Sequence, residues 1–194
     1  MYKLFVAAPL LFIAYGIVRW MDGTDGEYGP GLAWTIGHLL FLAGFLLFAL
    51  VLVALRRMVT RSRAIATIAM VVGLIGVLAF VRVIVIDLLV GFDSSDHASM
   101  SRVGDRYDRW PGNLGIYDAV YSVGPMLFLI GFLTLTILLV RLHRLPIWAP
   151  AALVLGFAAI IVNLTLMPLG GALLLAALLP LQRPARDLQK VPSR

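Results

Sequence analysis

Long apolar segments alternate with short polar ones along most of the chain. A helix that crosses the apolar core of a bilayer needs about 20 mostly apolar residues, and the pattern predicts six of them. The predicted helices cover residues 4–20, 31–55, 64–90, 114–140, 147–166 and 169–182. The segments are continuously apolar, which indicates helices rather than the alternating strands of a membrane barrel. We therefore expect an all-α fold, a polytopic transmembrane helical bundle, with residues 1–194 forming one integral membrane domain.

Two local patterns refine this bundle. The run Met167-Pro168-Leu169-Gly170-Gly171 predicts a tight hairpin between the last two helices. Residues 37–46 and 124–133 match at seven of ten positions. This match predicts parallel helical-hairpin repeats, with chance matching among Leu, Phe and Gly as the alternative. In either case, glycines seven residues apart share a helix face and let a neighbouring helix approach closely.

Composition and charge support a membrane location and an orientation. Hydrophobic residues make up 61% of the chain and charged residues 13%, which excludes an ordinary soluble domain. Eleven basic residues and one acid, Asp187, fall on one side of the predicted membrane, and five basic residues and nine acids on the other. The eleven are Lys3, Arg56, Arg57, Arg61, Arg63, Arg141, Arg144, Arg183, Arg186, Lys190 and Arg194. The positive-inside rule then predicts a multi-pass protein of the cell membrane with both termini in the cytoplasm. The net charge is +6. We interpret the basic residues behind it as topology determinants and contacts for lipid phosphates, and we expect no nucleic-acid partner.

Several polar residues fall inside the predicted helices, in the outer half of the membrane. Charges there cost about 2.5–3.5 kcal/mol near a helix centre on insertion scales, so they usually face a cavity or a partner. The polar members are His38, Arg82, Asp87, Asp118 and Asn163, and the aromatic residues near them are Trp34, Trp110, Tyr117 and Tyr121. One interpretation is an outer-half pocket for a lipophilic molecule. The alternative is an interfacial aromatic belt with a structural bridge between Arg82 and an aspartate.

The placement of Asp87 late in one helix and Asp118 early in the next resembles the small integral-membrane terpene cyclases. The resemblance implies acid-initiated cyclisation or isomerisation of an isoprenoid, with either aspartate as the acid and His38 or the other carboxylate as the final base. Trp34, Tyr117 and Tyr121 would line the chamber, where aromatic faces stabilise a carbocation. The wider substrate-binding set adds Arg82, Trp110 and Asn163. No cofactor is expected, and no metal, because the three histidines fall in separate parts of the predicted topology.

Two non-enzymatic functions stay open beside this hypothesis. The number of helices, the cytoplasmic termini and the length resemble the vitamin-binding subunits of energy-coupling-factor transporters. The chain also fits an accessory or structural subunit, in which the polar residues only hold helices together. Both hypotheses imply a partner membrane subunit or a second copy of the chain.

The outer loop over residues 92–113 carries charges of both signs. Asp105 and Arg109 are four residues apart, as are Arg102 and Arg106, a spacing that supports a short surface helix. We expect that helix to end at Trp110-Pro111. The loop is either an exposed, self-paired segment or a lid over the outer end of the bundle.

Overall fold

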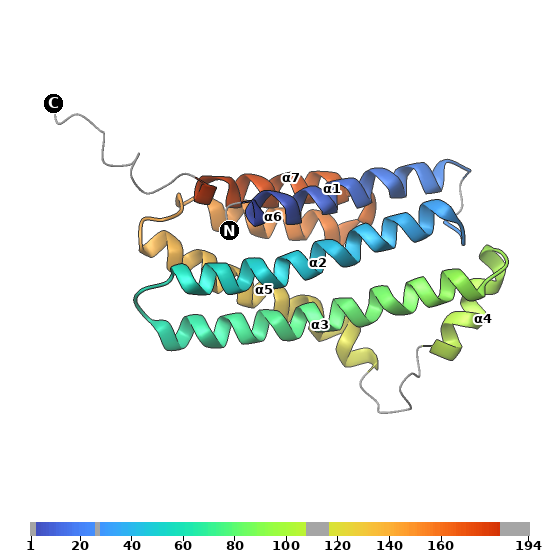
Figure 1. Cartoon of the computed structure of the whole chain (residues 1–194), viewed down its shortest axis with the longest axis horizontal. Coiled ribbons are helices and arrows are strands. Elements are labelled where there is room, and N and C mark those ends of the chain that lie inside the picture. Colours follow the sequence, from blue (N-terminus) through green and yellow to red (C-terminus); the bar gives the residue numbers. More distant parts are fainter. Residues whose placement is uncertain (1–2, 26–27, 108–116, 183–194) are drawn as a thin grey trace.

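The computed structural model describes residues 3–25, 28–107 and 117–182, and all regular structure in these ranges is helical (Figure 1). The α-helices are α1 (Leu4–Asp22), α2 (Leu32–Met58), α3 (Arg63–Asp93), α4 (His97–Tyr107), α5 (Tyr117–Arg141), α6 (Ala149–Val162) and α7 (Met167–Leu178). The 3-10 turns are η1 (Gly23–Asp25), η2 (Leu164–Leu166) and η3 (Leu179–Gln182). The predicted all-α, polytopic membrane bundle is confirmed.

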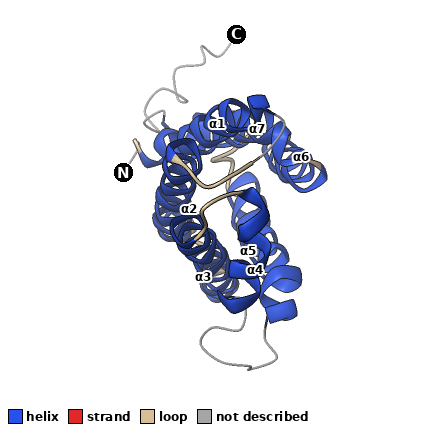
Figure 2. Cartoon of the chain, turned by 90° about the vertical axis from the view of Figure 1, so that its right-hand side faces the viewer, coloured by secondary structure: helices blue, strands red, loops and turns tan. Residues whose placement is uncertain are grey.

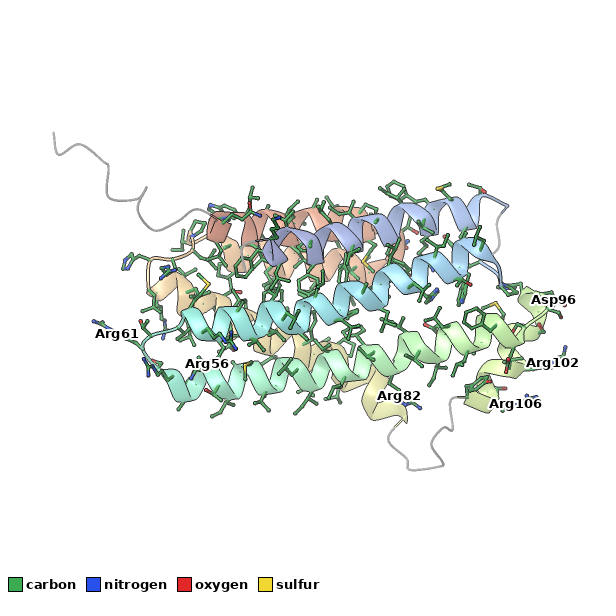
Figure 3. All side chains as sticks on the ribbon, viewed as in Figure 1. Arg56, Arg61, Arg82, Asp96, Arg102 and Arg106 are labelled. Atoms are coloured by element: carbon green, nitrogen blue, oxygen red, sulfur yellow. The ribbon has the colours of Figure 1, made fainter. Side chains whose placement is uncertain are left out.

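The long helices run side by side, and the two ends of the bundle differ in charge. Viewed along the helices, α3, α2, α1, α7 and α6 follow one another in an arc, and α5 lies against α3 (Figure 2). We call one end the arginine-rich end, because the α2–α3 and α5–α6 connections and the helix ends beside them carry Arg56, Arg57, Arg61, Arg63, Arg141 and Arg144. The opposite end carries α4 and its charged side chains (Figure 3), and we call it the α4 end. The first residue of α1 and the last residue of η3 lie toward the arginine-rich end (Figure 1).

Five helical segments are long and apolar enough to cross a membrane: Leu4–Asp22, Leu32–Met58, Arg63–Asp93, Val123–Arg141 and Leu164–Gln182. The sixth segment, α6, has only 14 residues. At a rise of 1.5 Å per residue it measures about 21 Å, which is less than the roughly 30 Å of a bilayer core. The predicted helix over 147–166 is therefore shorter than expected, because it ends at Val162.

The hairpin between α6 and α7 lies four to five residues earlier than the Pro-Gly-Gly run predicts. Asn163 is extended and its side-chain oxygen accepts a hydrogen bond from the Thr165 amide at 2.8 Å. Pro168 sits in the first turn of α7, where a missing amide proton costs no hydrogen bond. Gly170 is helical and faces the backbone of Gly156 on α6. The glycines predicted to turn the chain instead let two helices touch.

The backbones of α3 and α5 approach closely, and these two helices also make the most extensive contact in the described chain. A Cβ atom at Gly76 would overlap the backbone of Phe128. A Cβ atom at Gly131 would lie 2.5 Å from the amide nitrogen of Gly73. Small residues stabilise membrane helix pairs in this way, because dispersion contacts between backbones replace the missing hydrophobic effect.

The matching glycines of the two similar segments each contact the preceding long helix. Gly37 faces Tyr15 of α1, and a Cβ atom at Gly44 would meet the Phe12 ring at 2.8 Å. Gly124 and Gly131 face α3 in the same manner. The structure thus gives these four positions the packing role that the sequence predicts, in α1 with α2 and in α3 with α5.

Phenylalanine rings fill the space between these helices. Phe45 stacks on Phe80 with 4.1 Å between ring centroids. Phe128 is fully buried and meets Phe45, Phe132 and Phe157 edge-on or tilted at 5.3–5.7 Å. Edge-to-face pairs at such separations add to the dispersion energy of the core. The centre of the bundle is therefore packed with aromatic side chains.

The predicted surface helix exists as α4, and it begins with a reciprocal cap. The Asp96 carboxylate accepts a hydrogen bond from the Ser99 amide at 2.7 Å, and the Ser99 hydroxyl accepts one from the Asp96 amide at 3.2 Å. This arrangement satisfies two amides that a helix start otherwise leaves unpaired. The hydrogen bonds from the Ser99 amide and the Ser95 hydroxyl hold the pKa of Asp96 below its ordinary value.

A methyl group at the α3–α5 contact should disrupt the bundle. We expect Gly76→Ala to force the two backbones apart and to lower the stability by roughly 1–3 kcal/mol, as overpacking does in other cores. Thermal unfolding in detergent measures the effect. Gly104→Ala is the matched control, because nothing lies within 4 Å of a Cβ atom there. Equal melting temperatures for the two variants would contradict this account of the packing.

The start of α4 should loosen in acid. Because the pKa of Asp96 is lower in the folded chain, the cap contributes its full stabilisation at pH values above the pKa of the unfolded chain, near 3.8. This stabilisation is lost as the pH falls through the lower pKa of the folded chain. The amide chemical shift of Ser99, followed by NMR through this range, should report the loss. Asp96→Asn keeps an oxygen acceptor but does not titrate, so its shift should stay constant. An identical acid transition in that variant would exclude Asp96 as the cause.

Candidate functional site

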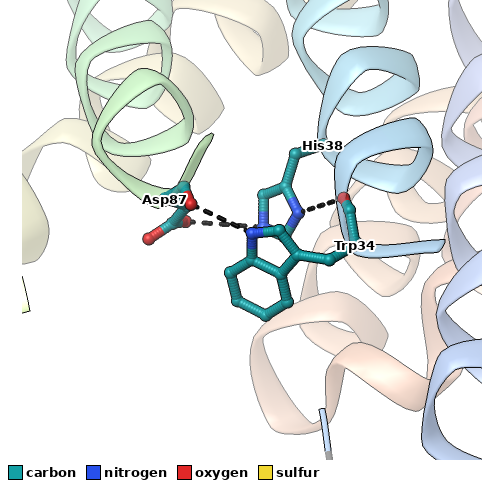
Figure 4. A network of polar contacts seen from close by, with 3 residues as sticks. All are labelled: Trp34, His38 and Asp87. Atoms are coloured by element: carbon teal, nitrogen blue, oxygen red, sulfur yellow. Dashed lines mark hydrogen bonds and ion pairs between the residues drawn. The ribbon is translucent and has the colours of Figure 1, made fainter. Parts of the chain in front are cut away.

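Three of the predicted site residues meet where α2 and α3 cross near the α4 end (Figure 4). His38 Nε2 lies 3.7 Å from a carboxylate oxygen of Asp87. The Trp34 indole N–H donates a hydrogen bond to the backbone carbonyl of Asp87 at 3.0 Å. The Trp34 and His38 rings also contact each other, with 4.1 Å between centroids. We call these three residues the Trp-His-Asp network.

The network fixes the orientation of the imidazole. His38 Nδ1 lies 2.8 Å from the Trp34 carbonyl oxygen, one helical turn earlier on α2. Because a carbonyl only accepts, Nδ1 carries a proton and donates it there. The other nitrogen, Nε2, is left to face Asp87, at a distance beyond a direct hydrogen bond. The Asp87 side chain is 37% exposed and His38 is buried, so water reaches the carboxylate more easily than the ring.

Gly91 lets the indole lie against α3. A Cβ atom at this position would come within 2.5 Å of the Trp34 ring. Gly91 is one turn beyond Asp87, whose carbonyl oxygen receives the indole hydrogen bond. The glycine and the carbonyl together form a notch in α3 that holds one tryptophan from α2. Sequence reasoning missed Gly91, although a glycine four residues after a helical aspartate was a visible signal.

Helix length places the Trp-His-Asp network at the membrane boundary. Asp87 follows Arg63 by 24 residues on one helix, which is about 36 Å at 1.5 Å per residue. His38 precedes Arg57 by 19 residues on α2, or about 29 Å. The apolar core of a bilayer is roughly 30 Å thick. With the arginines at one surface, the network therefore lies near the opposite headgroups, where a charge costs much less than at mid-membrane.

Four further residues extend the network to α1, the first loop and α4. The Tyr15 ring packs edge-on against His38, with 5.9 Å between centroids. The Arg19 guanidinium lies 4.0 Å from the centre of the Tyr28 ring, a cation–π contact. His97 of α4 donates from Nδ1 to the Tyr28 carbonyl at 2.6 Å. Tyr15, Arg19 and Asp22 are spaced four and three residues apart on α1, a pattern that could have assigned them to one face.

The space beside the network is too small for a lipophilic substrate. The cavity between α1 and α2, lined by Tyr15, Arg19, Trp34 and His38 among others, has a volume of about 10 Å³. A single water molecule needs about this much room. Below it, the phenylalanine rings fill the centre of the bundle. Among the residues that the structure describes, this cavity offers no chamber for an isoprenoid chain.

The structure gives no printed contact between the Trp-His-Asp network and the remaining predicted site residues, several of which lie outside what it describes. Arg82 lies on α3, five residues before Asp87, and is half-buried. Asn163 is an exposed turn residue bonded to Thr165. The structure gives the backbone of Tyr117, Asp118 and Tyr121 in the first turns of α5 but does not describe their side chains, and Trp110 lies outside the described residues. Their predicted roles have no structural account.

The described residues contain no group of three His, Cys, Asp or Glu side chains that could hold a metal ion. The Trp-His-Asp network offers one imidazole and one carboxylate. Its geometry fits a polar contact that fastens α2 to α3.

Comparison with known proteins gives one family match. The model of the Got1/Sft2-like family matches residues 3–93. This range covers α1, α2 and α3 and ends at the last residue of α3, so it includes the whole Trp-His-Asp network and slightly less than half of the chain. No curated protein and no solved structure gave a match.

The resemblance to membrane terpene cyclases is wrong. The matched family is a different one, and the match includes Asp87, one of the two aspartates on which the resemblance depended. Acid-initiated cyclisation of an isoprenoid by Asp87, Asp118 and His38 is overturned with it. The filled core and the one-water cavity give the physical reason, because the layout of two aspartates does not create a chamber.

Removal of the indole hydrogen bond should weaken the contact between α2 and α3. We expect Trp34→Phe to lower the stability by about 1 kcal/mol, because the ring is largely kept while the donor to Asp87 is lost. Thermal unfolding in detergent measures it. The control, Trp148→Phe, makes the same change at a tryptophan that is 48% exposed. A loss of similar size in the control would show that the hydrogen bond has no special role.

Proposed function

We propose that this chain is a non-enzymatic, multi-pass membrane protein that acts through protein partners in vesicle traffic. The match to the Got1/Sft2-like family over α1–α3 carries the proposal, since that family consists of vesicle-trafficking membrane proteins. The proposal favours the accessory-subunit hypothesis over both the enzyme and the transporter component. It also replaces the cell membrane with an internal membrane of the secretory route as the expected location.

The geometry of the matched helices supports a structural role for their polar residues. Trp34 and His38 contact Asp87 across the α2–α3 interface, the indole through a hydrogen bond and the imidazole through a longer polar contact with the carboxylate. Double-mutant studies assign such contacts in membranes a fraction of a kcal/mol to about 2 kcal/mol each. Under this proposal the three residues set the crossing of α2 and α3, and partners bind surfaces outside the network.

Location and secretion together test the proposal. A fluorescently tagged chain in its native host should coincide with markers of internal secretory membranes. Deletion of the gene should slow the delivery of a secreted reporter, and the wild-type gene should restore it. A surface-membrane location with unchanged secretion after deletion would overturn the proposal.

One variant separates this function from acid–base chemistry. Asp87→Asn keeps the backbone carbonyl that receives the Trp34 indole, but it cannot deliver a proton at neutral pH. We expect it to restore secretion in the deletion strain as the wild type does. A variant that folds, as judged by its melting temperature, yet fails to restore secretion would contradict a non-enzymatic role.

A further inference from the structure

A cavity at the arginine-rich end brings together two connections that are distant in sequence. Arg61 and Ser62 of the α2–α3 connection line it from one side. Arg141, the last residue of α5, lines it from the other with Leu138 and Leu142. Its volume is about 200 Å³. Two arginines and a serine thus line one cavity together with two leucines.

The charged residues that line this cavity, Arg61 and Arg141, are both basic. In the part of the chain that the structure describes, no carboxylate lies within ion-pair distance of Arg61 or Arg141. The neighbouring Arg56 differs, because its Nε donates to the Thr67 hydroxyl at 2.7 Å. Arginine presents several donors in a planar fork that matches phosphate or carboxylate oxygens. Two such groups facing one cavity favour an anionic occupant.

The backbone on both sides of the cavity is held in an unusual conformation. Ser62 and His143 are the two non-glycine residues with positive φ in the described ranges, each at 55°. A left-handed conformation costs about 1–2 kcal/mol for a residue with a Cβ atom. Ser62 precedes α3 but makes no side-chain cap, since a capping residue normally needs an extended backbone. Its hydroxyl therefore takes no part in capping α3, and the residue lines the cavity.

His143 closes the end of α5 in a Schellman motif. Its amide donates to the Val140 carbonyl, and the Arg144 amide donates to the Leu139 carbonyl, both at 2.9 Å. The motif terminates the helix directly after Arg141 and Leu142. The cavity-lining residues Leu138, Arg141 and Leu142 are thereby held at a closed, hydrogen-bonded helix end.

The size and position of the cavity indicate a headgroup rather than a whole molecule. Its volume is below the 300–1,000 Å³ of typical small-molecule pockets and about seven times a water's share of the liquid, roughly 30 Å³. The helix lengths that place Asp87 near one membrane surface place Arg61 and Arg141 near the opposite surface. Leu138 continues the wall into the apolar bundle.

We propose that Arg61, Ser62 and Arg141 bind a phosphate group at the arginine-rich end. The same chemistry is available from the headgroup of an anionic phospholipid or from a soluble phosphate. The proposal does not depend on the vesicle-traffic function, because it follows from this cavity alone.

Native mass spectrometry of the full chain, released from detergent, tests it by counting bound molecules. Three probes are compared: phosphatidic acid, phosphatidylcholine and inorganic phosphate. We expect one tightly held phosphatidic acid and no matching phosphatidylcholine if the source is lipid. Binding of inorganic phosphate with the same stoichiometry would identify a soluble source. Absence of both phosphatidic acid and inorganic phosphate would overturn the proposal.

Variants assign the binding to this cavity. Each arginine near an anionic surface is worth roughly a five-fold gain in affinity, so Arg61→Gln with Arg141→Gln should weaken binding about 25-fold. Arg57→Gln removes the same charge from the same end without lining the cavity and should bind nearly as the wild type does. An equal loss in Arg57→Gln and Arg61→Gln would mean diffuse surface charge and would overturn the site.

Ser62→Gly separates binding from folding. Glycine adopts the left-handed conformation without strain, so the melting temperature should stay the same or rise while the affinity for the phosphate probe falls. A lower melting temperature without any loss of affinity would give Ser62 a purely structural role and would remove it from the proposed site.

Discussion

The bundle depends on the direct contact between the backbones of α3 and α5. Inside a bilayer, lipid tails are as apolar as leucine, so association relies on close fit rather than on burial from water. Gly76 and Gly131 allow this fit because any Cβ atom there would overlap the partner backbone. With α5 held against α3, the Phe128 ring reaches the centre of the bundle and meets Phe45 and Phe157. The aromatic core follows from the glycine contact.

The filled core favours a structural role for the polar residues at the α4 end. Trp34, His38 and Asp87 contact one another on top of packed aromatic rings, beside a cavity of about one water. They join α2 to α3 within the three helices that match the Got1/Sft2-like family. Chemistry on a lipophilic substrate needs space as well as an acid, and the aromatic rings occupy that space.

The sequence predicts the fold better than the site, for physical reasons. Apolar run length reveals a membrane helix directly, and the spacing of Gly124 and Gly131 reveals its packing face. The turn at Asn163 was misplaced because proline and glycine also serve helix starts and close helix contacts, and local sequence does not separate these uses. For Asp87 and His38, the sequence predicts only that each polar side chain needs a partner, and not that the two contact each other. Their partnership depends on the crossing of α2 and α3, and the Gly91 notch for Trp34 depends on it as well.

The short helix α6 has a consequence for the surrounding lipid. Its 14 residues give about 21 Å of apolar surface, whereas the neighbouring hydrocarbon is roughly 30 Å thick. A shorter apolar stretch is accommodated by local thinning of the bilayer, at a fraction of a kcal/mol per Å of mismatch. Since α6 lies at one end of the helical arc (Figure 2), the thinning falls on one flank only. An asymmetric mismatch of this kind draws the two bilayer surfaces closer together on the α6 flank than on the side of α2 and α3.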